Sequence, residues 1–321
     1  MECGLVSCEW LREALGSSAA EGPALCIVDA TWYLPNSPFA APESSAGAQA
    51  DFLTTGPRLP GAVFFDIDAV AEKHPNGVPH MLPSDDVFSA AMAALGIERD
   101  TQVVVYDRHG MFSAPRFWYT LKVAFQHPAD VAVLDGGLPR WKALGYAIEE
   151  GALPLPPAPA PVASWSRCPA ASVDMAQVLA NIDAKTAQLV DARPAARFLG
   201  TAPEPRAGMR GGHVPGSSSV PFLELITGGP GSTLRSKGEL REKFAAAGVV
   251  VDEAPPGPDA SCVVTMCGSG LTACIVCLAM HQLGMPLSRM SLYDGSWSEW
   301  GAQADTPVVR QGADGTDEPV P

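Results

Sequence analysis

The sequence predicts an α/β protein with two tandem domains, each a mostly parallel β-sheet flanked by helices. Short, continuously apolar runs alternate with segments of helical length, which is the pattern of a parallel sheet covered on both faces. The chain also repeats its own landmarks in the same order, at a spacing of about 160 residues. Its 321 residues are enough for two domains of ordinary size.

The first copy opens with an amphipathic helical pattern over residues 7–15. Four apolar runs then predict strands at 24–30, 59–66, 103–107 and 131–135. A helix is expected over 117–125, and the Gly-Gly pair at 136–137 predicts a turn before a short helix that carries Trp141.

The second copy repeats four landmarks of the first. The matching segments are 189–192 with 27–30, 213–216 with 58–61, 263–267 with 103–107, and 292–300 with 133–141. Four matches at nearly one spacing indicate a domain duplication. The period is too long, and the copies too few, for a solenoid.

Composition also sets the domain boundaries. Residues 151–163 hold five prolines in thirteen residues, which predicts an extended connector because proline disrupts helices and central strands. The stretch 309–321 is rich in Gly, Asp, Glu and Pro, and we expect a disordered tail there. The two domains are therefore expected at 1–150 and 164–308.

A strand-to-helix turn at 267–273 carries the strongest functional signal. Gly268 and Gly270 let the backbone turn its N–H groups inward and form an anion-binding hollow. The helix that follows directs its positive end into the same hollow. Such a setting stabilises the thiolate of Cys267, the form that acts as a nucleophile. Taken alone, the stretch is equally compatible with a buried cysteine beside an ordinary glycine-rich turn.

The duplication places this nucleophile in the second copy only. Asp107 holds the place in the first copy that Cys267 holds in the second. We therefore expect domain 164–308 to be catalytic, and domain 1–150 to be non-catalytic and to contribute other groups.

Composition excludes several partner classes. The net charge of −14 argues against nucleic acid and anionic membranes as partners, and no apolar run approaches the ~20 residues of a spanning helix. The first eighteen residues hold three glutamates against one arginine, which is unlike a secretory signal or transit peptide. Eight cysteines without such a signal indicate a reducing compartment, so we expect the cytoplasm, with the mitochondrion as the alternative.

The motifs in combination resemble the tandem-domain rhodanese-like sulfurtransferases, and within them most the 3-mercaptopyruvate sulfurtransferases. The segments that carry the resemblance are 33–35, 64–68, 80–83, 113–116, 134–137, 197–206, 212–216, 267–273 and 294–297. The resemblance runs from about residue 6 to residue 308. The chain departs from the family in the long 36–55 loop and at Arg58, where the family usually has histidine.

The resemblance implies a sulfur-transfer reaction at Cys267. This cysteine would take the sulfur of 3-mercaptopyruvate as a persulfide, release pyruvate, and pass the sulfur to a thiol such as reduced thioredoxin or a small dithiol, or to cyanide. Arg197 and Arg206 correspond to the family arginines that hold the carboxylate and keto oxygens, for which planar guanidinium groups are suited. The resemblance implies no cofactor and no metal.

Further residues are assigned to the site by the same resemblance. Gly268, Gly270, Leu271 and Thr272 would complete the loop that binds the sulfur. Ser269, His80 and Asp68 correspond to a hydroxyl–imidazole–carboxylate relay that would handle the proton of the departing enolate. The alternative is that His80 is structural and that Asp68 caps a turn.

Three other functions can be distinguished from this one by the residues at and after Cys267. Thiosulfate:cyanide sulfurtransferases carry basic residues directly after the cysteine, where this chain has Gly268 and Ser269. A cysteine phosphatase needs arginine six residues after the cysteine, where this chain has Ala273. A non-catalytic rhodanese-like binding protein would not need Cys267.

Cys274 and Cys277 form a C-x-x-C pattern inside an apolar helix without a second ligand pair, so a zinc site is not expected.

Overall fold

The computed structural model describes residues 4–16, 24–43, 45–153, 164–251, 262–312 and 315–320. Most of the predicted connector, residues 154–163, lies outside the described residues. The chain forms two compact units. The first unit is made of Met1–Val70, Pro83–Arg167 and Thr227–Leu234, and the second of Ala71–Leu82, Cys168–Ile226 and Arg235–Pro321. Each unit therefore includes a short segment from the other half of the sequence.

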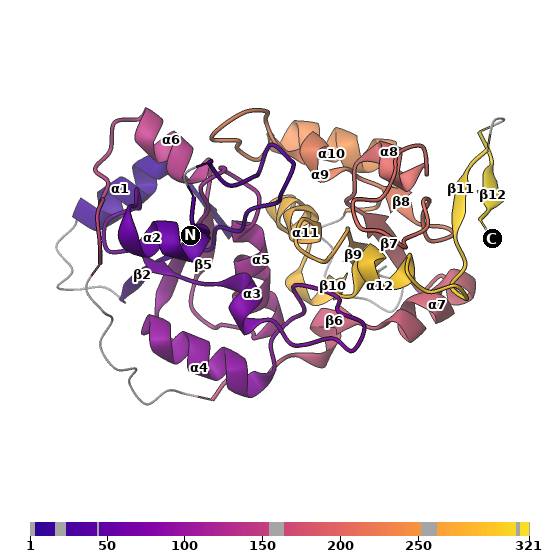
Figure 1. The fold of residues 1–321 in the computed structure, drawn as a ribbon, viewed down its shortest axis with the longest axis horizontal. Helices are drawn as coiled ribbons and strands as arrows, with labels where there is room; N and C mark the ends of the chain where they lie inside the picture. The colour runs from indigo at the N-terminus through magenta and orange to yellow at the C-terminus, as the bar shows by residue number, and fades with distance from the viewer. Residues whose placement is uncertain are drawn as a thin grey trace. The chain divides into compact units, whose positions relative to one another are not determined.

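The first unit contains a five-stranded parallel sheet in the order β1-β5-β4-β2-β3. Its strands are β1 (Leu5–Val6), β2 (Leu25–Asp29), β3 (Val63–Phe64), β4 (Gln102–Tyr106) and β5 (Val131–Leu134). Its helices are α1 (Cys8–Gly16), α2 (Ala48–Thr54), α3 (Ile67–Val70), α4 (Asp85–Leu95), α5 (Ala114–Trp118) and α6 (Gly137–Ala143), as Figure 1 shows. Apart from Gln102 at the start of β4, strands β4 and β5 are apolar because both faces of the sheet are buried.

The second unit repeats this topology in the strand order β6-β10-β9-β7-β8, again all parallel. The strands are β6 (Ser172–Val173), β7 (Ala187–Asp191), β8 (Ser218–Ser219), β9 (Cys262–Met266) and β10 (Met290–Tyr293). The helices are α7 (Met175–Ala184), α8 (Ala195–Phe198), α9 (Phe222–Leu225), α10 (Lys237–Ala246), α11 (Ala273–Gln282) and α12 (Ser296–Trp300). Short 3₁₀ turns, η3 (Pro169–Ala171) and η4 (Leu287–Arg289), complete it.

The duplication is visible in single hydrogen bonds. Ala30 N donates to Tyr106 O at 3.0 Å in the first unit, and Ala192 N donates to Met266 O at 2.8 Å in the second. Both bonds join the end of the second sheet strand of a unit to its central strand. The predicted α/β class with two parallel-sheet domains is confirmed.

Some predicted elements differ in extent from the observed ones. The strand expected over 59–66 shrinks to β3, because Leu59 O accepts from Ala62 N at 3.2 Å and closes a turn before it. The helix expected over 117–125 begins earlier, as α5, and continues as a π-helical turn, Tyr119–Ala124. Helices α7 and α10 were not singled out from the sequence, although each starts with a capping box.

The carboxyl-terminal segment differs from the expected disordered tail. Strands β11 (Val309–Gln311) and β12 (Asp317–Pro319) form an antiparallel pair. Val309 exchanges two backbone hydrogen bonds with His213, at 2.8 and 3.0 Å, and Val308 is buried in the core of the second unit. Backbone pairing of this kind does not depend on side-chain composition, so a polar, Pro- and Gly-containing sequence does not reveal it.

Each unit has its own hydrophobic core. In the first, Val104, Tyr106 and Leu134 of the sheet pack with Trp141 of α6. In the second, Trp297 and Trp300 of α12 are fully buried in the core, which favours a packing role for both.

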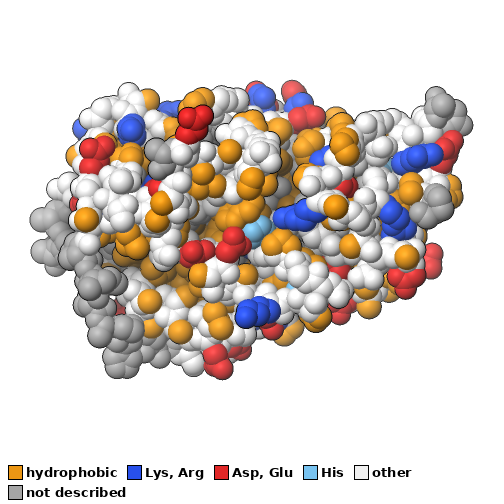
Figure 2. Space-filling model, viewed as in Figure 1, with side chains coloured by type: hydrophobic (Ala, Val, Ile, Leu, Met, Phe, Trp, Pro, Cys, Tyr) orange, Lys and Arg blue, Asp and Glu red, His pale blue; other side chains and the backbone are white. Residues whose placement is uncertain are grey.

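The surface view in Figure 2 shows basic and acidic side chains interspersed with apolar and uncharged ones. On the described part of this face, no continuous basic area is seen. No helix in the described ranges is both long enough and apolar enough to cross a membrane.

Candidate active site

Cys267 lies at the carboxyl end of β9, before α11, and is 2% exposed. Its backbone is fixed by the start of α12. Cys267 N donates to Ser296 Oγ at 3.2 Å, and Trp297 N donates to Cys267 O at 3.0 Å. Ser298 N donates to Gly268 O at 2.9 Å. The loop that carries the cysteine is therefore held in place by the Asp-Gly-Ser-Trp motif of the same unit.

The first unit shows what this loop geometry does to an anion. The carboxylate of Asp107, at the place equivalent to Cys267, accepts five backbone N–H bonds from its own loop. The donors are His109 at 2.9 Å, Gly110 at 2.8 Å, Phe112 at 2.8 Å, Ser113 at 2.9 Å and Ala114 at 3.0 Å. The duplicated loop is thus built to surround the negative end of the side chain at its first position.

The same hollow in the second unit surrounds a cysteine instead of an internal carboxylate. The positions equivalent to the first and third donors of the Asp107 loop are Ser269 and Thr272. Within the described part of the chain, the backbone N–H groups of these two residues have no acceptor. Helix α11 begins directly after Thr272 and is buried from Ala273 to Met280. The loop can therefore stabilise a thiolate or a persulfide anion at Cys267.

Arg197 lies beside this loop. A Cβ atom built on Gly268 would stand 3.5 Å from Arg197 Nη2 and 3.8 Å from Nη1. The opposite edge of the guanidinium is held by Glu204, with Nε donating to Oε1 at 3.2 Å and Nη2 donating to Oε2 at 2.5 Å. The Nη1/Nη2 end is therefore the part of Arg197 that faces the loop. A carboxylate or keto oxygen could be bound there.

Glu204 belongs to a buried ionic network that sequence reasoning missed. Its side chain is 1% exposed, and Oε1 also accepts from Arg193 Nη1 at 2.9 Å. Arg193 is fully buried, and its Nη2 donates to Asp191 Oδ2 at 2.6 Å. Its guanidinium carbon stands 3.9 Å from the Trp297 ring centre. Two carboxylates and two guanidinium groups alternate, so each buried charge is paired. The signal available in the sequence was two arginines, Arg193 and Arg197, enclosed by two acidic residues, Asp191 and Glu204.

Arg206 reaches the same loop through a hydroxyl group. Its Nη1 donates to Ser298 Oγ at 3.0 Å, and that hydroxyl donates to Gly268 O at 2.6 Å. Ser298 was not singled out from the sequence. The two arginines predicted from the family motif are thus both connected with the backbone around Gly268.

The three predicted relay residues lie in two units. Ser269 is 9% exposed in the Cys267 loop, and His80 is 3% exposed with a positive φ of 62°. Both belong to the second unit, where the 71–82 segment is fixed by Leu82 N donating to Asp294 Oδ2 at 2.6 Å. Asp68 belongs to the first unit, and its Oδ2 accepts from Trp32 Nε1 at 2.8 Å.

Several neighbouring side chains have structural partners of their own. It is Asp66, and not Asp68, whose carboxylate accepts the N–H groups that start α3. His213 Nδ1 bonds to Phe198 O at 2.8 Å, so this ring is used in a backbone hydrogen bond. The thiols of Cys274 and Cys277 have different partners, Gly270 O at 3.4 Å and Thr265 Oγ1 at 3.2 Å.

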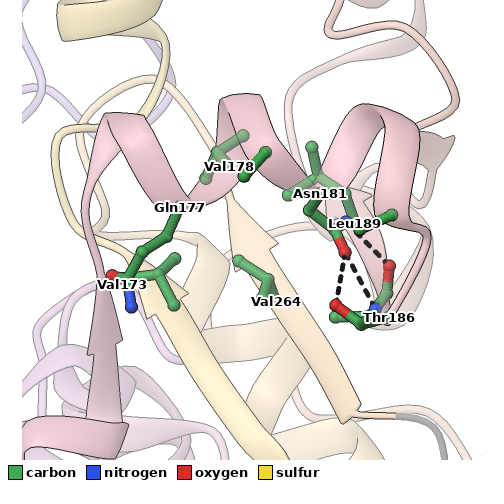
Figure 3. Close-up of a pocket in the computed structure, with 10 residues that line it drawn as sticks. Val173, Gln177, Val178, Asn181, Thr186, Leu189 and Val264 are labelled. Carbon is green, nitrogen blue, oxygen red and sulfur yellow. Dashed lines mark hydrogen bonds between the residues drawn. The ribbon is translucent and has the colours of Figure 1, made fainter.

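A separate pocket of about 320 Å³ lies between α7 and the sheet of the second unit (Figure 3). Its walls include the apolar side chains of Val173, Val178 and Val264. The polar side chain of Asn181 is already bonded, with Nδ2 donating to Ala187 O at 2.9 Å and Oδ1 accepting from Thr186 Oγ1 at 3.1 Å. This pocket therefore presents packing surface and no reactive group.

The comparison with known protein families agrees with this geometry. The rhodanese-like domain profile matches residues 11–144 and 174–303. The chain belongs to the rhodanese-like domain family, with one copy of the domain in each half.

Individual relatives refine the comparison. The chain is 38% identical to a 3-mercaptopyruvate sulfurtransferase of Escherichia coli strain K12, over 94% of this chain and 96% of the relative. It is 36% identical to thiosulfate/3-mercaptopyruvate sulfurtransferase 1, mitochondrial, of Arabidopsis thaliana, over 95% of this chain and 77% of the relative. The crystal structure of SseA from Escherichia coli, described as a 3-mercaptopyruvate sulfotransferase, superposes with a TM-score of 0.72 at 36% identity, covering 93% and 100% of the two chains.

Proposed function

We propose that this protein is a 3-mercaptopyruvate sulfurtransferase with Cys267 as its nucleophile. The observation that carries the proposal is the position of Cys267. It stands in a loop whose first-unit counterpart gives five N–H bonds to an anion, with the Nη1/Nη2 end of Arg197 beside it. The names of the similar relatives from Escherichia coli and Arabidopsis support the same substrate.

In the first half-reaction, the Cys267 thiolate attacks the sulfur of 3-mercaptopyruvate. An S–S bond forms, the C–S bond breaks, and its electron pair leaves as the enolate of pyruvate. The thiol proton of the substrate is transferred to the enolate carbon, so that pyruvate and an enzyme persulfide anion result. The loop N–H groups stabilise the persulfide. Ser269, His80 and Asp68 are proposed to carry the proton.

Arg197 and Arg206 are proposed to bind the carboxylate and keto oxygens. Because Glu204 holds one edge of Arg197, the guanidinium is oriented before the substrate arrives, which lowers the entropy lost on binding. Gly268, Gly270, Leu271 and Thr272 are proposed to shape the sulfur pocket.

In the second half-reaction, an acceptor attacks the outer sulfur of the persulfide. With a dithiol such as reduced thioredoxin, the products are the disulfide, hydrogen sulfide and the Cys267 thiolate. With cyanide, the product is thiocyanate. We propose the cytoplasm as the location, and the mitochondrial relative from Arabidopsis keeps the mitochondrion as the alternative.

The test of the nucleophile is the Cys267→Ser variant. We expect it to lose sulfur transfer entirely, because a serine hydroxyl cannot hold a persulfide. After 3-mercaptopyruvate alone, the unmodified protein should gain about 32 Da, one sulfur atom, on the peptide that contains Cys267. Cys274→Ser is the matched control and should keep the mass gain. Activity in the Cys267→Ser variant would overturn the mechanism.

Thiosulfate:cyanide sulfur transfer is the second candidate function, since the Arabidopsis relative carries both substrates in its name. Gly268 and Ser269 leave the loop without a side-chain cation for the thiosulfate dianion. We therefore expect kcat/KM for 3-mercaptopyruvate to exceed that for thiosulfate at least about tenfold, which is a difference of about 1.4 kcal/mol. Parallel turnover assays with cyanide as acceptor measure the ratio.

A further inference from the structure

A second cavity, of about 740 Å³, lies within the first unit. It is lined by the segment after β2, by the loop after β4 and by α6. Arg108 and His109 of that loop occupy the repeat positions of Gly268 and Ser269 in the second unit. Small ligands of parallel α/β sheets bind outside the carboxyl ends of the strands, and the volume is that of a small-molecule site.

This cavity is not a second sulfur-transfer site. The inner hollow of the first-unit loop is already filled by the Asp107 carboxylate with its five N–H donors. Any ligand of the cavity must therefore be recognised by side chains on the outer side of the loop.

Arg108 is fixed and has an unused donor group. Its side chain is 10% exposed, and Nε donates to the buried carboxylate of Asp29 at 3.1 Å. Its Nη2 atom is buried and has no hydrogen-bond partner among the described residues. A buried donor without an acceptor is unfavourable, so a ligand that supplies an acceptor there relieves that penalty. A guanidinium held at Nε is preorganised for a carboxylate.

The other polar groups of the cavity add one further cation. Burial lowers the pKa of His109 and favours its neutral form, so its buried Nε2, unpartnered within the described ranges, adds no positive charge. Lys142 of α6 lines the cavity and makes no ion pair with any described residue. The carboxylate of Asp51 is already occupied, since it accepts from Tyr33 Oη at 3.2 Å, Ser45 Oγ at 2.5 Å and Ala46 N at 3.1 Å.

We propose that this cavity binds a small organic carboxylate. The carboxylate would accept from Arg108 and Lys142, and its apolar body would lie against Tyr33 and Leu138, which also line the cavity. The ring of His109 stands edge-on to that of Tyr33, with 5.6 Å between ring centres, so the aromatic wall is held in place.

The proposal is tested with benzoate as the probe and benzamide as its neutral counterpart, by isothermal titration of the full-length protein. We expect saturable binding of one benzoate with a Kd of about 1 mM or tighter, and at least about fivefold weaker binding of benzamide. Lys142→Met should weaken benzoate binding at least about fivefold. Lys142 is exposed and unpaired within the described residues, so this variant does not threaten the fold.

Two control variants distinguish binding in this cavity from binding elsewhere on the protein. Lys237→Met, which removes an exposed lysine of the second unit, should leave benzoate binding unchanged. Arg206→Ala should also leave it unchanged, whereas loss of binding in that variant would place benzoate at the catalytic arginines. Absence of saturable binding, or equal affinities of the unmodified and Lys142→Met proteins, would overturn the proposal. Lys142→Met should keep full sulfur transfer, so the result does not depend on the proposed reaction.

Discussion

At the scale of single residues, the contacts of the two arginines near Cys267, the proposed nucleophile, indicate that lysine would not replace them fully. Arg197 uses its Nε/Nη2 edge for Glu204 and presents its Nη1/Nη2 end to the loop at Gly268. Arg206 donates to the hydroxyl of Ser298, and that hydroxyl donates to the backbone carbonyl of Gly268. Only a guanidinium can satisfy two planar partners on two edges at once.

We therefore predict that Arg197→Ala or Arg206→Ala lowers kcat/KM for 3-mercaptopyruvate by about 30- to 1,000-fold, a loss of about 2–4 kcal/mol in transition-state binding. Arg197→Lys should recover only part of this, because a lysine can serve either Glu204 or the substrate. Steady-state kinetics measure the effect, with Arg241→Ala on α10 as the control. Changes below about threefold in both alanine variants would remove these arginines from the site.

Glu204 itself gives a further prediction at this scale. Glu204→Gln keeps the shape of the side chain but removes the charge that pairs with Arg193 and Arg197. We expect KM for 3-mercaptopyruvate to rise about tenfold, with a smaller change in kcat, because the orientation of Arg197 is lost while Cys267 is untouched. A lower kcat with unchanged KM would assign Glu204 another role. The persulfide mass gain should remain, which separates positioning from misfolding.

At the scale of elements, the loop 267–273 and helix α11, which follows it, form the part of the site that sequence could largely predict. The glycine spacing and the apolar helix after it are local signals. Ser296 and Ser298, which fix the loop through 3.2 Å and 2.6 Å bonds, come from a segment about thirty residues later. Ser296 and Ser298 can reach the loop only because β10 lies beside β9. This tertiary contact cannot be read from the local sequence pattern.

The loop also offers a test of substrate choice. In the first unit the equivalent positions hold Arg108 and His109, while the second holds Gly268 and Ser269. A Cβ at position 268 meets Arg197 only at ordinary van der Waals distance, 3.5 Å, so a side chain can be introduced there. We predict that the double variant Gly268→Arg, Ser269→Lys lowers the preference for 3-mercaptopyruvate over thiosulfate at least about tenfold, since it adds cations beside the sulfur.

The matched control for this loop is Gly268→Gln, Ser269→Gln, which fills similar space without charge. Its ratio of the two kcat/KM values should stay near that of the unmodified protein. If the neutral and the basic double variants shift the ratio equally, volume and not charge sets the preference, and the loop's lack of cations does not select the substrate.

At the scale of the whole chain, the duplication was predictable, but the exchange of segments was not. Segment 227–234 belongs to the first unit and segment 71–82 to the second. In both units the segment is bonded to the Asp of the repeated Asp-Gly motif: Leu234 N donates to Asp135 Oδ1 at 2.9 Å, and Leu82 N donates to Asp294 Oδ2 at 2.6 Å. A repeat pattern aligns equivalent residues, but it does not show which segment packs on which unit.

One of these two carboxylates, that of Asp135, has a shifted pKa. Burial raises the pKa of Asp135 to about 6, from 3.8, against the opposing effects of the Leu234 N–H group and Arg140. The folded state then binds more protons than the unfolded state between about pH 4 and pH 6, so stability falls as pH rises through this window and stays lower above it.

Asp135→Asn removes this titration and keeps an oxygen that can accept from Leu234 N. We predict that the free energy of unfolding of this variant, relative to the unmodified protein, increases by about 1–3 kcal/mol between pH 4.5 and pH 7.5. Urea unfolding at the two pH values measures it, with the exposed Asp183→Asn as control. A difference that does not change with pH would mean that Asp135 is ionised at no cost in the folded protein, and that the 227–234 segment binds it as a carboxylate.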